Sequence, residues 1–219
     1  KAVYSQIHAE SVSLDETAAT LGYWSAASHD VLTLTATISP DKTLDKTVSW
    51  ATSDANIADV DQSGNVTPTG KGKATITATA EGKTASCDVT VVQRIDSAVI
   101  TVSASEVYTG GEIKPDVTVT LDGTALNAEN YEVSYTDNTN VGTATVTVKG
   151  TAANYYGGEA SAAFAITKRQ ITVTPSAGQS KTYGATEPVF AYSSSETGAT
   201  FTGALARETG DNVGTYAYT

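Results

Sequence analysis

The stretch from Val48 to Val91 alternates apolar and polar residues, and this alternation constrains the fold more than any other feature of the sequence. From Ala85 onward every second residue is apolar, and the residues between them are Ser, Asp and Thr. A period of two places alternate side chains on opposite faces of a β-strand, one toward a core and the other toward water. The pattern therefore predicts antiparallel strands with Trp50, Ile76 and Cys87 facing inward.

The rest of the chain also favours an all-β fold. The segment from Val31 to Ile38 alternates in the same way, and glycines stand in the short turns between the predicted strands. No stretch keeps an apolar face of helical period over the ~12 residues that a stable helix needs. Because the chain has 219 residues and one β-sandwich takes about 100, we expect two or three modules in series.

An internal repeat indicates that there are three modules. The pentapeptide Ala98–Val102 returns as Arg169–Val173, and Asn140–Thr143 returns as Asn212–Thr215, at offsets of about 71–75 residues. Repeats of this kind mark copies of one structural unit. The predicted modules are residues 1–92, residues 93–168 and residues 169–219.

The joints and ends of these modules lead to two further expectations. A polar segment, Gln93 to Ser97, links the first two modules and is short enough to limit their relative freedom. The third copy stops before any counterpart of the last strand of the second copy, predicted at Ala162–Thr167. An incomplete third module would leave an open sheet edge, so we expect self-association through residues 169–219.

The amino-acid sequences of the predicted strands and turns resemble those of two kinds of bacterial module. Four blocks carry the first resemblance, in this order: VSWATSD, IADVDQSGNVT, GKATITA and ASCDVTV. Over residues 8–92 they resemble the bacterial immunoglobulin-like domain, group 2. The segments LDGTAL, NYEVSYTDN and NYYG in residues 93–168 are similar to tandem glycine-rich Ig-like repeats of bacterial surface proteins, with a truncated copy in residues 169–219.

The resemblance implies serial immunoglobulin-like β-sandwich modules in a multidomain bacterial protein that is secreted or displayed on the cell surface. It brings no catalytic residues with it. The chain starts at Lys1 and contains no methionine, so we expect a mature region or an excised fragment whose export signal lies elsewhere. The predicted location is therefore extracellular or at the cell surface.

Composition argues against several classes of partner. A net charge of −11 with no basic cluster repels phosphate backbones, so nucleic-acid binding is not expected. No apolar run reaches the ~20 residues of a membrane-spanning helix, and membrane insertion is not expected within this sequence. A single cysteine, Cys87, leaves no internal disulfide framework.

Two groups of aromatic residues are the candidate ligand-binding sites. Tyr23, Trp24 and His29 lie in LGYWSAASHD, which is predicted to be a loop where the resembled family has a short turn. Tyr155 and Tyr156 precede two glycines in a second predicted turn. Aromatic side chains on loops contact sugar rings and protein partners, so a glycan or a host or matrix protein is the candidate ligand. The structural alternative is that Trp24 caps the end of a core and the tyrosines support a turn.

Catalytic and metal sites find little support in the sequence. Asp59 to Gly64 has the opening spacing of an EF-hand calcium loop, but the twelfth position, which needs a bidentate Glu, is Gly70. No nucleophile elbow, paired histidine motif or phosphate loop is present. We therefore predict no catalytic residues, no metal site and no cofactor.

The function predicted from the sequence is non-catalytic. The modules are expected to act as a structural spacer, with adhesion as an additional role. The alternative is a glycan- or protein-binding accessory module attached to an extracellular enzyme.

Overall fold

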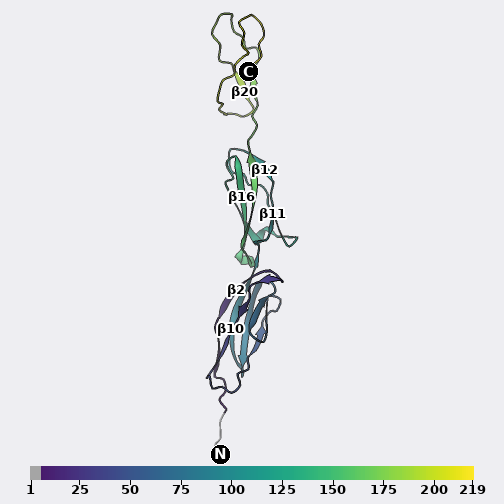
Figure 1. Cartoon of the computed structure of the whole chain (residues 1–219), viewed down its shortest axis with the longest axis vertical. Coiled ribbons are helices and arrows are strands. Elements are labelled where there is room, and N and C mark those ends of the chain that lie inside the picture. Colours follow the sequence, from purple (N-terminus) through teal and green to yellow (C-terminus); the bar gives the residue numbers. More distant parts are fainter. Residues whose placement is uncertain (1–5) are drawn as a thin grey trace, which may run out of the picture. The chain divides into compact units, whose positions relative to one another are not determined.

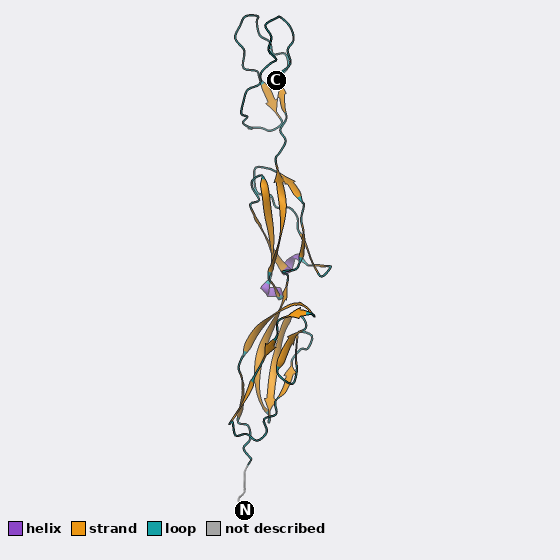
Figure 2. Ribbon diagram, in the orientation of Figure 1, coloured by secondary structure: helices purple, strands orange, loops and turns teal. Residues whose placement is uncertain are grey.

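The computed structural model describes residues 6–219, which fold almost entirely into β-strands and form two compact units. One unit ends at Thr167, and the other spans Lys168–Thr219. The only helical turns among the described residues are two short 3₁₀ turns, η1 at Ala128–Asn130 and η2 at Ala152–Asn154 (Figure 2). The prediction of an all-β chain is therefore confirmed. None of the helices among residues 6–219 is long and apolar enough to cross a membrane.

Ten strands build a first sandwich. One sheet has the order β3-β2-β10-β9-β6, and it shares one apolar core with the sheets β1-β5 and β4-β8-β7. Figure 1 shows β2 beside β10, with which it pairs in parallel. The strands are β1 Ser11–Leu14, β2 Ala18–Ser25, β3 Ser28–His29, β4 Leu32–Thr33, β5 Ala36–Ser39, β6 Ser49–Thr52, β7 Ala58–Val60, β8 Asn65–Pro68, β9 Gly72–Ala80 and β10 Lys83–Arg94.

The core of the first sandwich follows the predicted alternation. Trp50 retains 8% of its exposed area, while Ile76 and Cys87 are fully buried in one cluster of apolar side chains. The turns also follow the sequence, because Gly64 and Gly82 adopt positive φ values of 82° and 78°, which glycine reaches without a steric penalty. The predicted inward-facing set is thus confirmed.

Two segments differ from their predictions. The segment around Tyr23, predicted to be a loop, is instead a hairpin of β2 and β3. It is extended because the backbone of β2 pairs in parallel with β10. The prediction of a polar linker from Gln93 to Ser97 is also wrong in part. Strand β10 continues through Arg94, and the side chain of Ile95 is fully buried. Ile95 is the one apolar residue of the joint, and it packs in the core of the next sandwich.

A second sandwich follows directly. It consists of the sheet β11-β13-β14 and the sheet β12-β18-β16-β15, with Val119 and Val148 in one buried cluster and Phe164 and Ile166 in another. The strands of these two sheets are β11 Val99–Thr101, β12 Ser105–Val107, β13 Thr118–Leu121, β14 Thr124–Ala125, β15 Tyr131–Thr136, β16 Gly142–Gly150 and β18 Glu159–Thr167. The short strand β17, Tyr156–Gly157, lies between β16 and β18 in the chain and pairs with β10 of the first sandwich.

Residues 168–219 contain far fewer strands. β19 (Val173–Pro175) pairs with β20 (Tyr192–Ser194), and a single bridge joins Arg207 and Tyr218. The Arg207 guanidinium bonds to Glu187 and to the carbonyl oxygens of Glu208 and Gly210. A polar network therefore organises much of this unit, in contrast to the apolar cores of the two sandwiches.

Candidate functional site: the joint between the first two sandwiches

Two of the predicted aromatic residues lie on opposite faces of β2. Tyr23 packs against the core of the first sandwich. Trp24 faces the other way, and its ring lies over Gly22, where an added Cβ would be 3.0 Å from the ring. The guanidinium carbon of Arg94 is 5.5 Å from the centroid of the Trp24 ring, within the range of a cation–π interaction. Trp24 is therefore part of a contact with the end of β10.

His29 pairs with Tyr23 across the β2–β3 hairpin. Its Nδ1 lies 2.9 Å from the carbonyl oxygen of Asp30, while the Asp30 carboxylate accepts a hydrogen bond of 2.7 Å from the backbone N–H of Gly22. These bonds hold the hairpin together locally. His29 is therefore brought beside Tyr23 by the hairpin pairing.

Tyr155 and Tyr156 lie at the opposite side of the same joint. β10 pairs with β9 as far as Val91, and then pairs in parallel with β17 from Gln93 onward. The Gln93 N–H donates to the Tyr155 carbonyl oxygen at 2.9 Å, and the Ile95 N–H donates to the Gly157 carbonyl oxygen at 2.9 Å. One strand thus leaves the first sandwich and becomes part of the second without an intervening linker.

Lys71 forms a second connection across the joint. It belongs to a turn of the first sandwich, yet its Nζ donates to the carbonyl oxygen of Asn154 at 3.0 Å. The same Nζ lies 4.3 Å from the centroid of the Tyr156 ring. Tyr156 also packs against the core cluster that contains Ile95. The tyrosine therefore touches a cation of one sandwich and the core of the other.

An ion pair fixes the end of β10. The Arg94 guanidinium donates to the two carboxylate oxygens of Asp96 at 2.8 and 3.0 Å, and the Glu159 N–H approaches the same carboxylate at 3.4 Å. These hydrogen bonds, that of Arg94 first, hold the pKa of Asp96 below its usual value. Arg94 thereby joins Trp24 of the first sandwich to a carboxylate that contacts the second.

Glycines permit the close approach of the two sandwiches. A Cβ on Gly157 would lie 2.7 Å from Cγ1 of Val92, and a Cβ on Gly158 would lie 2.5 Å from the Asp96 carboxylate. Gly150 has a similar constraint within the second sandwich, because its Cβ would meet the backbone nitrogen of Gly157 at 2.6 Å. A larger residue at any of these positions would force a neighbouring group to shift.

Lys71, Arg94 and Asp96 belong to this site but are not among the residues predicted for it from the sequence. Their contacts join residues that are distant in the chain, such as the pair of Lys71 and Asn154. The available signal was Gly157 and Gly158 after the tyrosines, since paired glycines often mark a close backbone approach. The same glycines also suit a tight turn, so this signal alone does not predict the joint.

The candidates for other chemistry have local structural roles. The Asp61 carboxylate accepts bonds from the backbone N–H groups of Ser63 and Asn65, which closes a turn. Cys87 is a buried free cysteine, and burial raises the pKa of its thiol. Among residues 6–219, no cluster of three or more His, Cys, Asp or Glu side chains could hold a metal ion.

Curated relatives match the chain over short segments. Lacto-N-biosidase of Bifidobacterium bifidum is 49% identical over 61 residues, which are 27% of this chain and 5% of that protein. Alpha-L-arabinofuranosidase of Bifidobacterium longum subsp. longum is 47% identical over 64 residues, which are 28% of this chain and 6% of the relative. The matches therefore span only about a twentieth of the length of these enzymes.

Solved structures of tandem immunoglobulin domains are distant neighbours. Extracellular domains 3–5 of Drosophila OTK share 13% identity and a TM-score of 0.37, covering 73% of this chain and 60% of that one. A variant of titin domains I67–I69 shares 10% identity and a TM-score of 0.37, covering 84% of this chain and 86% of the titin chain.

Family models match two segments of the chain. Residues 25–91 match the bacterial Ig-like domain (group 2), which confirms the resemblance and the immunoglobulin-like fold predicted for the first sandwich. Residues 171–219 match the MBG domain (YGX type). The chain thus carries a segment of the bacterial Ig-like domain (group 2) family, followed by a segment of the MBG domain (YGX type) family.

Proposed function

We propose that the chain is a non-catalytic spacer that holds neighbouring parts of an extracellular or surface-displayed bacterial protein at a fixed geometry. The observation that carries this proposal is the passage of β10 from the first sandwich to its pairing with β17. A spacer must resist bending at its joints. A strand that is hydrogen-bonded in both modules supplies that resistance, whereas a flexible linker does not.

The two side-chain contacts at the joint support the same role. On one side of the joint, Lys71 donates a hydrogen bond to the second sandwich. On the other side, Arg94 contacts both the Trp24 ring and the Asp96 carboxylate. Contacts on two sides oppose bending and twisting better than a single strand crossing. Burial of Ile95 adds an apolar anchor, because bending the joint would expose this side chain.

The relatives support a place beside carbohydrate-active enzymes. Two of them are named lacto-N-biosidase and alpha-L-arabinofuranosidase, and the segments that match are short. In this proposal the chain is an accessory part of such a protein and the catalytic domain lies elsewhere in it. Adhesion to a glycan or to a host or matrix protein through the aromatic residues is the second candidate, and the enzyme names of the relatives favour the glycan.

The substitution Trp24→Ala distinguishes these two functions. For a spacer, losing the ring that covers Gly22 and contacts Arg94 should cost about 1 kcal/mol. That loss should lower the thermal unfolding midpoint of the first unit by about 2–4 °C. The variant should bind a glycan array to the same extent as the wild type. Tyr183→Ala, at an exposed tyrosine of the other unit, is the matched control. Loss of glycan binding with an unchanged midpoint would favour the adhesive function instead.

A further inference from the structure

Each sandwich of the first unit pairs one of its early strands in parallel with its last strand. In the first sandwich, residues 18–23 of β2 lie beside residues 88–93 of β10, which makes six residue pairs. In the second sandwich, residues 105–107 of β12 lie beside residues 165–167 of β18, which makes three residue pairs. A direct ladder of hydrogen bonds therefore joins the part of the chain that enters each sandwich to the part that leaves it.

The parallel direction decides how such a ladder responds to tension along the chain. The N-terminal end of β2 and the C-terminal end of β10 lie at opposite ends of their ladder. A pull on these two ends slides the strands past each other, so the evenly spaced hydrogen bonds carry the load together. A pull on two ends at the same side instead opens the ladder one bond at a time. Tension through the chain therefore meets each ladder in its stronger direction.

The backbone of β2 shows which groups form the longer ladder. The Asp88 N–H donates to the Thr17 carbonyl oxygen at 3.0 Å. In a parallel ladder, one residue bonds to both neighbours of its partner, so the Asp88 carbonyl oxygen faces the N–H of Ala19. The Gly22 N–H points the other way and donates to the Asp30 carboxylate. Odd-numbered residues of β2 therefore donate to β10, and even-numbered residues direct their N–H groups away from it.

The ladder of the second sandwich is shorter. The Ala165 N–H donates to the Ala104 carbonyl oxygen at 3.0 Å, and the Tyr108 N–H donates to the Thr167 carbonyl oxygen at 2.9 Å. The Thr167 hydroxyl adds a bond of 3.0 Å to the Glu106 carbonyl oxygen. These bonds accompany half as many residue pairs as the ladder of β2 and β10. Under the same tension, each of them carries a larger share of the load.

Strand β10 connects the two sandwiches in one line of load. It pairs in parallel with β2 as far as Gln93, and with β17 at Gln93 and Arg94. Burial of Ile95 in the core of the second sandwich anchors the end of this strand. Tension on the second sandwich therefore reaches β2 through one continuous strand.

We propose that the first unit bears tension along the chain through these two parallel ladders in series. The second sandwich, which has the shorter ladder, unfolds before the first. This mechanical role rests on the spacer function proposed above and extends it, because a spacer under load must keep its length.

Pulling on single molecules of the full chain in two geometries tests the proposal. In a Cys87→Ala background, handles at Glu16→Cys and Ser97→Cys load opposite ends of the ladder between β2 and β10. Handles at Glu16→Cys and Lys83→Cys load one side of it, and all three handle positions are exposed. We expect an unfolding force several times higher in the first geometry, because six residue pairs then share the load. This force reports the barrier to unfolding and not the equilibrium stability.

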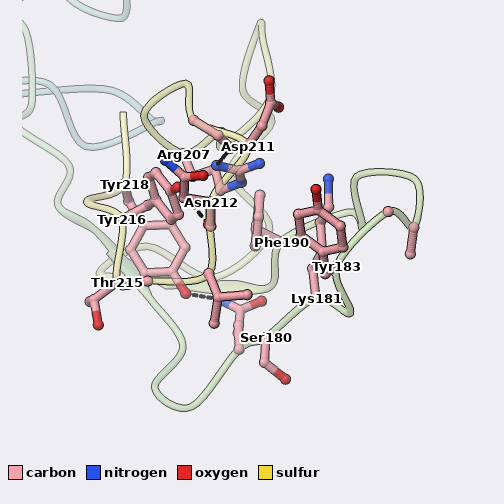
Figure 3. A pocket seen from close by; sticks show the side chains of 16 residues that line it. Ser180, Lys181, Tyr183, Phe190, Arg207, Asp211, Asn212, Thr215, Tyr216 and Tyr218 are labelled. Atoms are coloured by element: carbon pink, nitrogen blue, oxygen red, sulfur yellow. Dashed lines mark hydrogen bonds between the residues drawn. The ribbon is translucent and has the colours of Figure 1, made fainter.

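The handles leave the unit from Lys168 outside the load. Its described strand pairs are antiparallel. Side chains such as Phe190, Arg207 and Tyr216 line a hollow of about 750 Å³ in this unit (Figure 3). Because this unit is not stretched, its unfolding is not mistaken for that of a sandwich.

Two proline substitutions test the ladder itself. Ala19→Pro removes an N–H that faces β10, whereas Thr20→Pro removes an N–H on the opposite edge of β2. With the handles at opposite ends of the ladder, Ala19→Pro should lower the unfolding force. Thr20→Pro is the matched control and should leave the force unchanged. If Ala19→Pro does not fold, the comparison of the two pulling geometries still decides the question.

Handles at Glu16→Cys and Lys168→Cys, both exposed positions, extend the load to the two sandwiches. At about 3.5 Å per residue, residues 99–167 release roughly 240 Å of chain and residues 16–94 release roughly 280 Å. We expect the shorter step first and at the lower force. The lengths of the steps thus identify which sandwich unfolds.

Three outcomes would overturn the proposal. One is an equal unfolding force in the two pulling geometries of the first sandwich. Another is an equal loss of force in the two proline variants. The third is unfolding of the first sandwich before the second. None of these outcomes bears on the rigidity of the joint without load, so the spacer function would stand or fall by its own test.

Discussion

At the scale of single residues, the joint depends on positions where no side chain fits. Gly157 faces Val92, and Gly158 faces the Asp96 carboxylate at distances that exclude a Cβ. Gly158 also has a φ of +80°, and Tyr155, three residues earlier, adopts a φ of +58°, which is uncommon for a non-glycine residue. The local backbone is therefore specialised for close contact between the two sandwiches.

The substitution Gly157→Ala should separate the two sandwiches at this point. The added methyl group would lie 2.7 Å from Val92 Cγ1, and relieving such overpacking costs about 1–3 kcal/mol. Chemical denaturation of the wild type and variant measures this loss. Gly111→Ala is the control, because its Cβ would meet nothing within 4 Å. Equal destabilisation by the two substitutions would contradict the packing described here.

At the scale of elements, the alternation of apolar residues was sufficient to predict most strands. Trp50 and Cys87 are buried as their positions in the pattern require. The pairing of β10 with β17 was not predictable in this way, because Gln93 and Tyr156 are far apart in sequence and periodicity describes only local structure. For the same reason the sequence placed Trp24 and Tyr156 in separate turns, whereas the structure brings both to one joint.

The stability that the Arg94–Asp96 ion pair adds at the end of β10 should depend on pH. Because the folded pKa of Asp96 lies below its unfolded value, the Arg94 pair stabilises the fold above the unfolded pKa and is lost as pH falls through the folded pKa. We expect Asp96→Asn to be less stable than the wild type at neutral pH. The difference should shrink below about pH 4 and weaken in high salt. A difference that is constant from pH 7 to pH 3 would show that the carboxylate charge has no role.

At the scale of the whole molecule, the two compact units differ in what holds them together. The unit that ends at Thr167 contains the buried apolar clusters around Ile76, Val119 and Phe164. The unit from Lys168 has one deeply buried large apolar side chain, Phe190, and relies on the bonds of Arg207 to Glu187. The first unit is therefore stabilised mainly by apolar burial, and the second unit depends more on polar side-chain contacts.

The distribution of distances across the first joint tests the central claim most directly. Spin labels at Lys83→Cys and Thr139→Cys, both exposed positions, would report on the two sandwiches in a Cys87→Ala background. A joint built on the shared strand β10 predicts one narrow distance distribution, which broadens when Gly157→Ala is added. A wild-type distribution as broad as that of the variant would contradict a rigid joint and the spacer function that rests on it.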